Sequence, residues 1–138
     1  MIYALDSNTI SYMLREEGNT LNNFVQEIVE RKNGYAIPFI VAHEIERWLL
    51  YRPTRETMMY LDKFAKFFGR VRNKAEIPET VWNKATEIYI SLKAGGKLIG
   101  NADILIAAYC LVNDYTLVTR NTKDFERIEG LKLVNWFE

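Results

Sequence analysis

The chain has 138 residues, 49% of them hydrophobic and 13% aromatic, which is enough to bury the core of one compact domain. Its 18 basic and 18 acidic residues balance, which argues against a protein that coats nucleic acid by bulk charge. With one cysteine, no apolar run near the roughly 18 residues of a membrane helix and no signal-peptide pattern at MIYALDSN, the sequence favours a cytoplasmic protein without membrane association.

The first half of the chain predicts two short strands, each followed by helices. Residues 2–5 form an apolar run that stops at Asp6, and residues 35–37 form a second strand closed by Pro38. Residues 16–20 are polar and predict a loop. Apolar residues recur at helical spacing in the remaining segments, which are 9–15, 21–32, 40–51 and 54–68.

The second half continues the alternation. Pro78 can open a helix that runs to residue 94, residues 101–112 form a strongly apolar helix, and strands follow at 116–119 and 131–134. Residues 70–77 give an ambiguous pattern, which fits a short edge strand followed by a loop. Strands that alternate with helices predict one domain over 1–138, a three-layer α/β/α sandwich around a mainly parallel sheet of four to five strands.

Acidic residues follow the predicted strands, and catalytic groups of parallel sheets collect at the strands' carboxyl ends. Asp6 comes directly after the first strand. An aspartate before a helix is also a common N-cap, and both roles are compatible because a cap leaves one carboxylate oxygen free.

Two further acids lie on predicted helices. Asp103 opens the apolar helix, where a buried carboxylate needs a partner or a metal ion, although capping and the helix dipole also explain it. Glu44 flanks the apolar stripe of Val41, Ile45, Trp48 and Leu49, and a solvated helix-face glutamate is its alternative explanation.

After the strand at 116–119 come Asn121 and Asp124; taken alone, Asp124 is better explained as the cap of the turn that begins there. Oxygen ligands from several acids favour Mg²⁺ or Mn²⁺. Zinc is disfavoured because the chain has one histidine, His43, and one cysteine, Cys110, interpreted as a surface-to-boundary side chain and a buried thiol.

Four stretches carry a family pattern: IYALDSNTISYML, FIVAHEIERWL, LIGNADILIAA and TLVTRNTKDFERIEGLKLVNW. They cover essentially the whole chain, and in order and spacing they resemble the PIN-domain ribonucleases, specifically the VapC toxins of bacterial toxin–antitoxin pairs. The resemblance implies that Asp6, Glu44 and Asp103 bind the metal and that Asn8 is the polar residue beside the first acid.

The chain departs from this family at three positions. Some relatives carry aspartate where this chain has Asn121, so Asp124, the nearest carboxylate, is the candidate for the fourth catalytic acid. Ser7 stands where DTN is usual, and Trp48 stands where a glycine is frequent, which affects the groove or a dimer contact.

The resemblance implies hydrolysis of RNA, transfer RNA in particular, by water that the metal activates, leaving a 5′-phosphate and a 3′-hydroxyl. It also implies a homodimer and a VapB-like antitoxin. The aromatic residues around Trp48 and Phe64–Phe68 are mostly core, and their surplus is a candidate for the dimer face or for the groove that binds the antitoxin. Thr119 is a candidate to hydrogen-bond the metal water or a carboxylate, or else an ordinary strand threonine. Arg47, Lys97 and Arg120 are candidates for RNA phosphates, or else solvated side chains.

Two other functions compete. One is a non-catalytic PIN-fold module that binds RNA or a partner through a weakened metal site, marked by Asn121. The other is a phosphotransferase of the haloacid-dehalogenase kind with Asp6 as nucleophile, which needs a second aspartate where this chain has Asn8.

Overall fold

The computed structural model describes residues 1–69 and 77–138, and strands and helices alternate through both parts. The described strands are β1 (Ile2–Leu5), β2 (Gly34–Ala36), β3 (Thr116–Val118) and β4 (Leu133–Val134). The described helices are α1 (Ser7–Arg15), α2 (Thr20–Phe24), the π-helix η1 (Val25–Glu30), α3 (Phe39–Leu50), α4 (Arg55–Phe68), α5 (Glu79–Ala94), α6 (Asn101–Asn113) and α7 (Thr122–Phe125). The sequence pattern at 70–77 is ambiguous, and all of this region except residue 77 lies outside the described residues.

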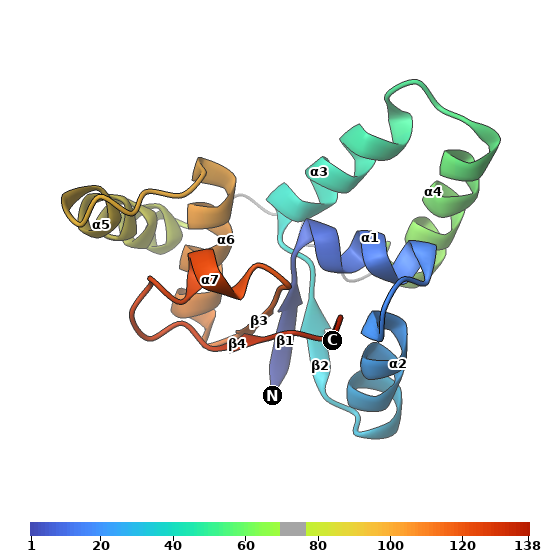
Figure 1. The fold of residues 1–138 in the computed structure, drawn as a ribbon, viewed down its shortest axis with the longest axis horizontal. Helices are drawn as coiled ribbons and strands as arrows, with labels where there is room; N and C mark the ends of the chain where they lie inside the picture. Colours follow the sequence, from blue (N-terminus) through green and yellow to red (C-terminus); the bar gives the residue numbers. More distant parts are fainter. Residues whose placement is uncertain (70–76) are drawn as a thin grey trace.

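The four described strands form one parallel sheet in the order β2-β1-β3-β4. Figure 1 shows α1, α2 and α4 on one side of this sheet and α5 and α6 on the other. The predicted α/β class with a parallel sheet is therefore confirmed. Because all four strands run the same way, their carboxyl ends meet at one edge, where α1, α3 and α7 begin.

Buried side chains of the core pack next to this edge of the sheet. Side chains from both strands and helices are fully buried there, among them Leu5, Ile10, Ile37, Val41 and Leu117. Burial of such side chains contributes roughly 1.5–3 kcal/mol each and holds the strand ends in place. Within the described residues no helix is long and apolar enough to cross a bilayer.

In α3 and α4, some of the apolar residues that recur at helical spacing are exposed. Trp48 of α3 is 36% exposed and Met58 of α4 is 46% exposed, while Val41, Ile45 and Leu49 of α3 are buried as predicted. Ala65 of α4 is exposed as well. The two helices pack on each other and on α1 through part of their apolar residues, so the remainder faces outward.

The predicted amphipathic helix over 21–32 is two elements. It begins at Thr20, inside the predicted loop, and changes to π geometry at Val25, with the Arg31 N–H donating to the carbonyl of Gln26 at 3.0 Å. A π-helix has wider turns, so residues spaced for a 3.6-residue period no longer share one face. Accordingly, no residue of η1 is buried.

Candidate active site

Asp6 stands at the carboxyl edge of the sheet because of the strand register. Leu5 of β1 pairs with Val118 of β3, so the next residues, Asp6 and Thr119, leave the sheet side by side. The Asp6 N–H donates to the Val118 carbonyl at 3.3 Å. Asp6 is also the N-cap of α1, where its Oδ1 accepts from the Thr9 N–H at 2.8 Å. Capping and a place at the strand end therefore coexist.

The Asp6 carboxyl is buried, at 7% exposure. This burial raises its pKa above the ordinary value, while hydrogen bonds from Thr119 and Thr9 oppose the rise and the negative charge of Glu44 adds to it. A buried carboxylate that is repelled by another acid is stabilised by a cation, because the cation offsets both the desolvation and the repulsion.

Glu44 reaches the same place from the second turn of α3, which begins just after β2. Ser7 is the first residue of α1, and its hydroxyl donates to Glu44 Oε1 at 2.6 Å. This bond ties the helix after β1 to the helix after β2. The sequence marks Ser7 only by its place directly after Asp6, where it departs from the family's usual DTN, and its partner is 37 residues away.

Asp103 joins the acids from the first turn of α6 and is half-buried. Burial raises its pKa, and the charges of Asp6, Glu44 and Asp124 raise it further, in that order. All four predicted acids thus share one electrostatic environment. Gly100 is the helix N-cap, so Asp103 is not the capping residue.

The residues after β3 form a hydrogen-bonded chain. Thr119 is fully buried, donates to Asp6 and accepts from the Asn121 N–H at 3.1 Å. Asn121 Nδ2 in turn donates to Asp124 Oδ2 at 2.9 Å, and Arg127 pairs with Asp124 at 3.3 Å. Asp124 lies inside α7 while Asn121 occupies the N-cap position, so the prediction that Asp124 caps this turn is wrong. Because Asn121 stands at the N-cap position, the Asp124 carboxylate lies one helical turn later.

The predicted polar neighbours differ in their surroundings. Asn8 is exposed on α1, two residues beyond Asp6. Arg120 lies over the ring of Phe137, with 3.6 Å between the guanidinium carbon and the ring centroid, and pairs weakly with Glu138 at 3.8 Å. His43 is exposed and Cys110 is buried, as expected.

The acids suit a hard cation that keeps part of its water. In the described part of the chain, no three histidine, cysteine, aspartate or glutamate side chains are arranged so that they could hold an ion by themselves. Mg²⁺ usually binds one or two carboxylates and completes its shell with water and substrate phosphate. Asp6 and Asp103, with Glu44 beside them, offer that chemistry.

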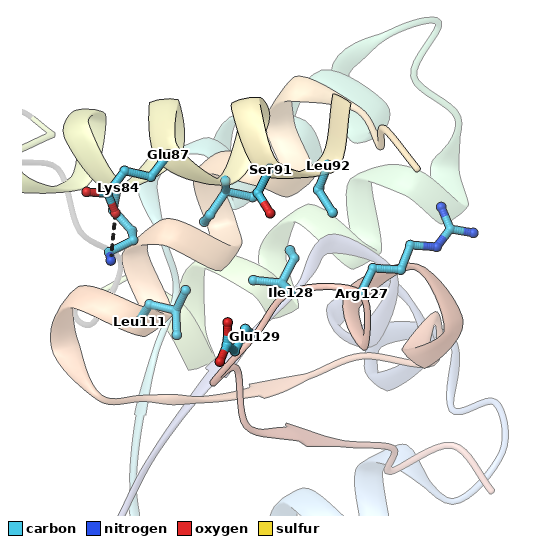
Figure 2. Close-up of a pocket in the computed structure, with 9 residues that line it drawn as sticks. Lys84, Glu87, Ser91, Leu92, Leu111, Arg127, Ile128 and Glu129 are labelled. Atoms are coloured by element: carbon cyan, nitrogen blue, oxygen red, sulfur yellow. Dashed lines mark ion pairs between the residues drawn. The ribbon is translucent and has the colours of Figure 1, made fainter. Parts of the chain in front are cut away.

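A separate cavity of about 330 Å³ lies between α5, α6 and the segment after α7 (Figure 2). None of the four acids lines it. Two of its charged residues, Lys84 and Glu87, pair with each other at 2.8 Å. A third, Arg127, pairs with Asp124 at 3.3 Å, so the cavity adjoins the rim of the acidic site through this one residue.

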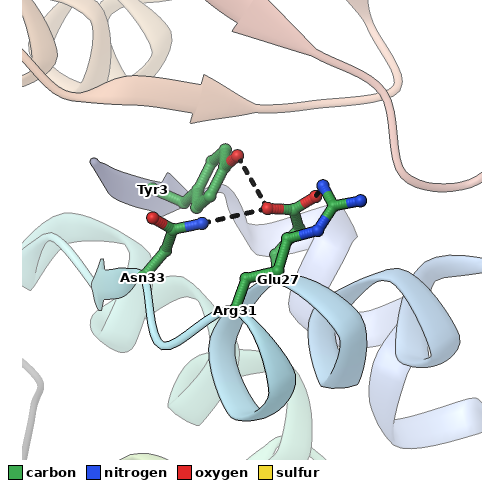
Figure 3. Close-up of polar contacts among 4 residues, drawn as sticks. All are labelled: Tyr3, Glu27, Arg31 and Asn33. Atoms are coloured by element: carbon green, nitrogen blue, oxygen red, sulfur yellow. Dashed lines mark hydrogen bonds and ion pairs between the residues drawn. The ribbon is translucent and has the colours of Figure 1, made fainter.

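Glu27 of η1 forms a second polar cluster (Figure 3). Its carboxylate accepts from the Tyr3 hydroxyl at 3.1 Å and from Asn33 Nδ2 at 3.0 Å, and it pairs with Arg31 at 2.6 Å. Asn33 directly precedes β2, so the cluster belongs to the amino ends of the strands. Every partner is a neutral donor or a cation, and the cluster therefore secures η1 to the sheet.

Comparison with known proteins places this geometry in a family. The family model of the PIN domain matches residues 3–131. The ribonuclease VapC2 of Rickettsia felis is 32% identical over 137 residues, which cover 99% of this chain and 98% of the relative. The ribonuclease VapC1 of Methanocaldococcus jannaschii is 31% identical, over 89% of this chain and 87% of the relative.

Solved structures agree with the sequence relatives. The crystal structure of VapBC2 from Rickettsia felis, bound to a DNA fragment from their promoter, matches with a TM-score of 0.81 and 29% identity, over 99% of both chains. VapBC-1 from nontypeable Haemophilus influenzae matches in fold with a TM-score of 0.78, over the full length of both chains. The resemblance expected from the four sequence stretches is therefore confirmed, and the chain belongs to the PIN-domain family, within it to the VapC ribonucleases.

Proposed function

We propose that this ribonuclease is a Mg²⁺- or Mn²⁺-dependent endoribonuclease whose cation is held by Asp6 and Asp103, with Glu44 completing the acidic group. The observation that carries the proposal is the convergence of the acids. Three of the carboxylates lie just after β1, β2 and β3, and the fourth, Asp103, lies in the first turn of α6. The charges of the other three raise the pKa of Asp103. Burial of mutually repelling carboxylates costs stability, which a functional cation would offset.

Each residue has a defined task in this proposal. When bound, the cation supplies Lewis-acid polarisation of the scissile phosphate and a lowered pKa for water. Thr119 and Thr9 hold Asp6 in one orientation through hydrogen bonds. Ser7 orients Glu44. Asn121 and Arg127 hold Asp124, the candidate fourth acid, at the rim of the site.

The test is cleavage of an RNA pool with Mg²⁺ or Mn²⁺ by wild type, Asp6→Ala and Asp103→Ala, each purified free of any antitoxin. We expect cleavage by wild type, with 5′-phosphate ends, and loss of at least about 100-fold in both variants. Circular dichroism must show that the variants remain folded. If the wild-type protein leaves structured RNAs intact with both metals, the proposal is wrong.

A non-catalytic binding module is the second candidate. It is favoured by Asn121, which stands in place of an acid and donates to Asp124. Calorimetric titration with Mn²⁺ separates the two functions, because a catalytic site requires a divalent cation bound at millimolar concentration or tighter. Absence of such binding would favour the module.

We infer transfer RNA as the substrate from the family resemblance. Carboxylates that would hold a cation make no contact that distinguishes one base from another, so the choice of RNA must come from the surface around them. End mapping of a total RNA digest by wild type against Asp6→Ala identifies the cleaved species. Cuts confined to messenger or ribosomal RNA would contradict the assignment.

We also propose that the chain is the toxin of a pair and binds a VapB-like antitoxin. The related structures from Rickettsia felis and Haemophilus influenzae are VapBC complexes. On this chain, large apolar side chains of α4 remain outside the core: Met58 is 46% exposed, Met59 53% and Phe67 65%. Such a face suits a partner's apolar segment.

Co-expression with the neighbouring small reading frame tests the partner. We expect a stable complex with wild type and a weaker one with Phe67→Glu, while Ile90→Glu on α5, equally exposed, serves as the matched control. We further propose a homodimer, which light scattering of the purified toxin measures directly. A monomer at micromolar concentration would contradict it.

A further inference from the structure

A groove beside the acids remains without an assigned ligand. It measures about 370 Å³ and lies between α1 and α3. This volume is within the range of roughly 300–1,000 Å³ that is usual for small-ligand sites. The groove adjoins the acidic group, because it is lined by Glu44, one of the four acids, and by Ser7, which donates a hydrogen bond to Glu44. The lining residues that matter for its ligand are Asn8, Ser11, Arg15, Arg47 and Trp48.

One aromatic ring of this groove is accessible and held in place. Trp48 follows Glu44 by one helical turn on α3 and is 36% exposed. Its ring lies 6.1 Å from that of Tyr60 on α4 at an interplanar angle of 30°. The Tyr60 hydroxyl donates to Glu56 Oε1 at 2.8 Å, which restrains the supporting ring. A restrained aromatic ring binds a flat ligand at low cost in conformational entropy.

The groove also contains two positively charged side chains, Arg15 and Arg47, together with Glu44. Arg15 lies at the end of α1, where its Nε donates to the Ser11 hydroxyl at 3.1 Å and its guanidinium pairs with Glu17 at 2.9 Å. Arg47 is exposed one residue before Trp48. Arginine, hydroxyl and amide groups are the usual contacts of phosphate oxygens.

We propose that this groove binds an unpaired nucleotide of the RNA next to the scissile phosphate, with its base on Trp48 and its phosphate at Arg15 and Arg47. The proposal rests on the ribonuclease function above and makes its substrate more specific. A base within a duplex is stacked on both sides and cannot lie on an aromatic side chain, so the groove selects a loop, bulge or end. The enzyme would therefore cut at or beside unpaired nucleotides.

An antitoxin segment is the competing occupant. The composition of the groove favours RNA, because two arginines, two serines and an asparagine accompany one exposed ring, with Glu44 and Ile45 completing the lining. By contrast, the exposed methionines and Phe67 of α4 provide the apolar surface that a protein segment requires. The two ligands therefore have separate chemical surfaces on this chain.

The experiment measures binding by fluorescence anisotropy in EDTA, so that no cleavage occurs. The probes are a fluorescein-labelled RNA hairpin with an unpaired loop and a duplex RNA of the same length. Trp48→Ala removes the ring, Trp48→Phe retains an aromatic face, and Trp82→Ala on α5 is the matched control, since Trp82 is also exposed, at 50%. Arg47→Gln tests the phosphate contact, with Lys93→Gln on α5 as its control.

We expect Trp48→Ala to weaken hairpin binding at least about fivefold, the low end for base–aromatic stacking, with duplex binding changed less than about twofold. Trp48→Phe and Trp82→Ala should stay within about twofold of wild type. Arg47→Gln should reduce the slope of log affinity against log salt by about 0.7, and Lys93→Gln should not.

Equal hairpin affinity in wild type and Trp48→Ala would overturn the proposal, as would a loss confined to antitoxin binding. Cleavage of the same hairpin in Mg²⁺ reports separately on the ribonuclease. Cleavage with binding that is independent of Trp48 refutes the groove alone. Binding that depends on Trp48 without any cleavage supports the groove and refutes the nuclease.

Discussion

Thr119→Val removes the hydroxyl that links Asp6 to the segment after β3, while it keeps the side chain's volume. Thr119 is fully buried, donates to the Asp6 carboxylate and accepts from the Asn121 N–H at 3.1 Å. A hydrogen bond to a charged group contributes about 1.5–3 kcal/mol. Asn121 is exposed, so its N–H can bond to water instead. We therefore expect a loss of about 2 kcal/mol in the free energy of unfolding.

Urea unfolding in EDTA measures this loss. With a slope of about 1–3 kcal/mol/M, the midpoint should fall by about 1 M. The hydroxyl stabilises the ionised carboxylate, so the deficit should be full above the pKa of Asp6 and should shrink as the pH falls and Asp6 takes up a proton. Thr119→Ser keeps the hydroxyl and is the control. A deficit that is the same in both variants, or independent of pH, would refute the reasoning.

Three further predictions concern the same region. Asp103→Asn should stabilise the metal-free protein by about 1 kcal/mol at neutral pH while abolishing RNA cleavage. Because burial and the neighbouring acids raise the folded-state pKa of Asp103, its contribution to stability is full below the unfolded-state pKa and is lost as the pH rises to the folded-state pKa. The difference between thermal melts of wild type and Asp103→Asn should grow over that rise in pH. Mg²⁺ at about ten times its dissociation constant should stabilise wild type by about 1.4 kcal/mol and leave Asp6→Asn unchanged in the same melts. Cys110, whose pKa burial raises to about 12, should resist iodoacetamide in the native protein and react after unfolding, as mass spectrometry would detect.

The candidate site residues, whose roles stay predictions, each have a local signature in the sequence. Asp6 ends an apolar strand, Asp103 interrupts an apolar helix, and Glu44 flanks the stripe of α3. These patterns follow from the cost of burying a carboxylate, which makes such residues conspicuous in a sequence. In the structure, the charges of Asp6 and Glu44 raise the pKa of Asp103, and the grouping of the three acids in one metal site stays a prediction.

The links between these residues could not be predicted in the same way. Ser7 and Glu44 are 37 residues apart, and the contact exists because β1 and β2 are neighbours in a parallel sheet whose next helices start at the same edge. Likewise, the contact of Asp6 with Thr119 follows from the pairing of Leu5 with Val118. Strand order is a property of long-range packing, and local hydrophobic patterns do not contain it.

The sequence by itself determined the class of fold and the parallel direction of the strands, and it singled out Asp6 and Asp103 as candidate acids, because hydrophobic period and isolated charge in apolar segments are local properties. Only the tertiary structure decided which side of α3 stays exposed, where the helix after α1 changes to π geometry, and that Asn121 rather than Asp124 occupies the N-cap position of α7. Those outcomes depend on how much of each apolar face its neighbours cover. The exposed ring of Trp48 beside the acids is the part of that outcome on which the proposed recognition of unpaired RNA depends.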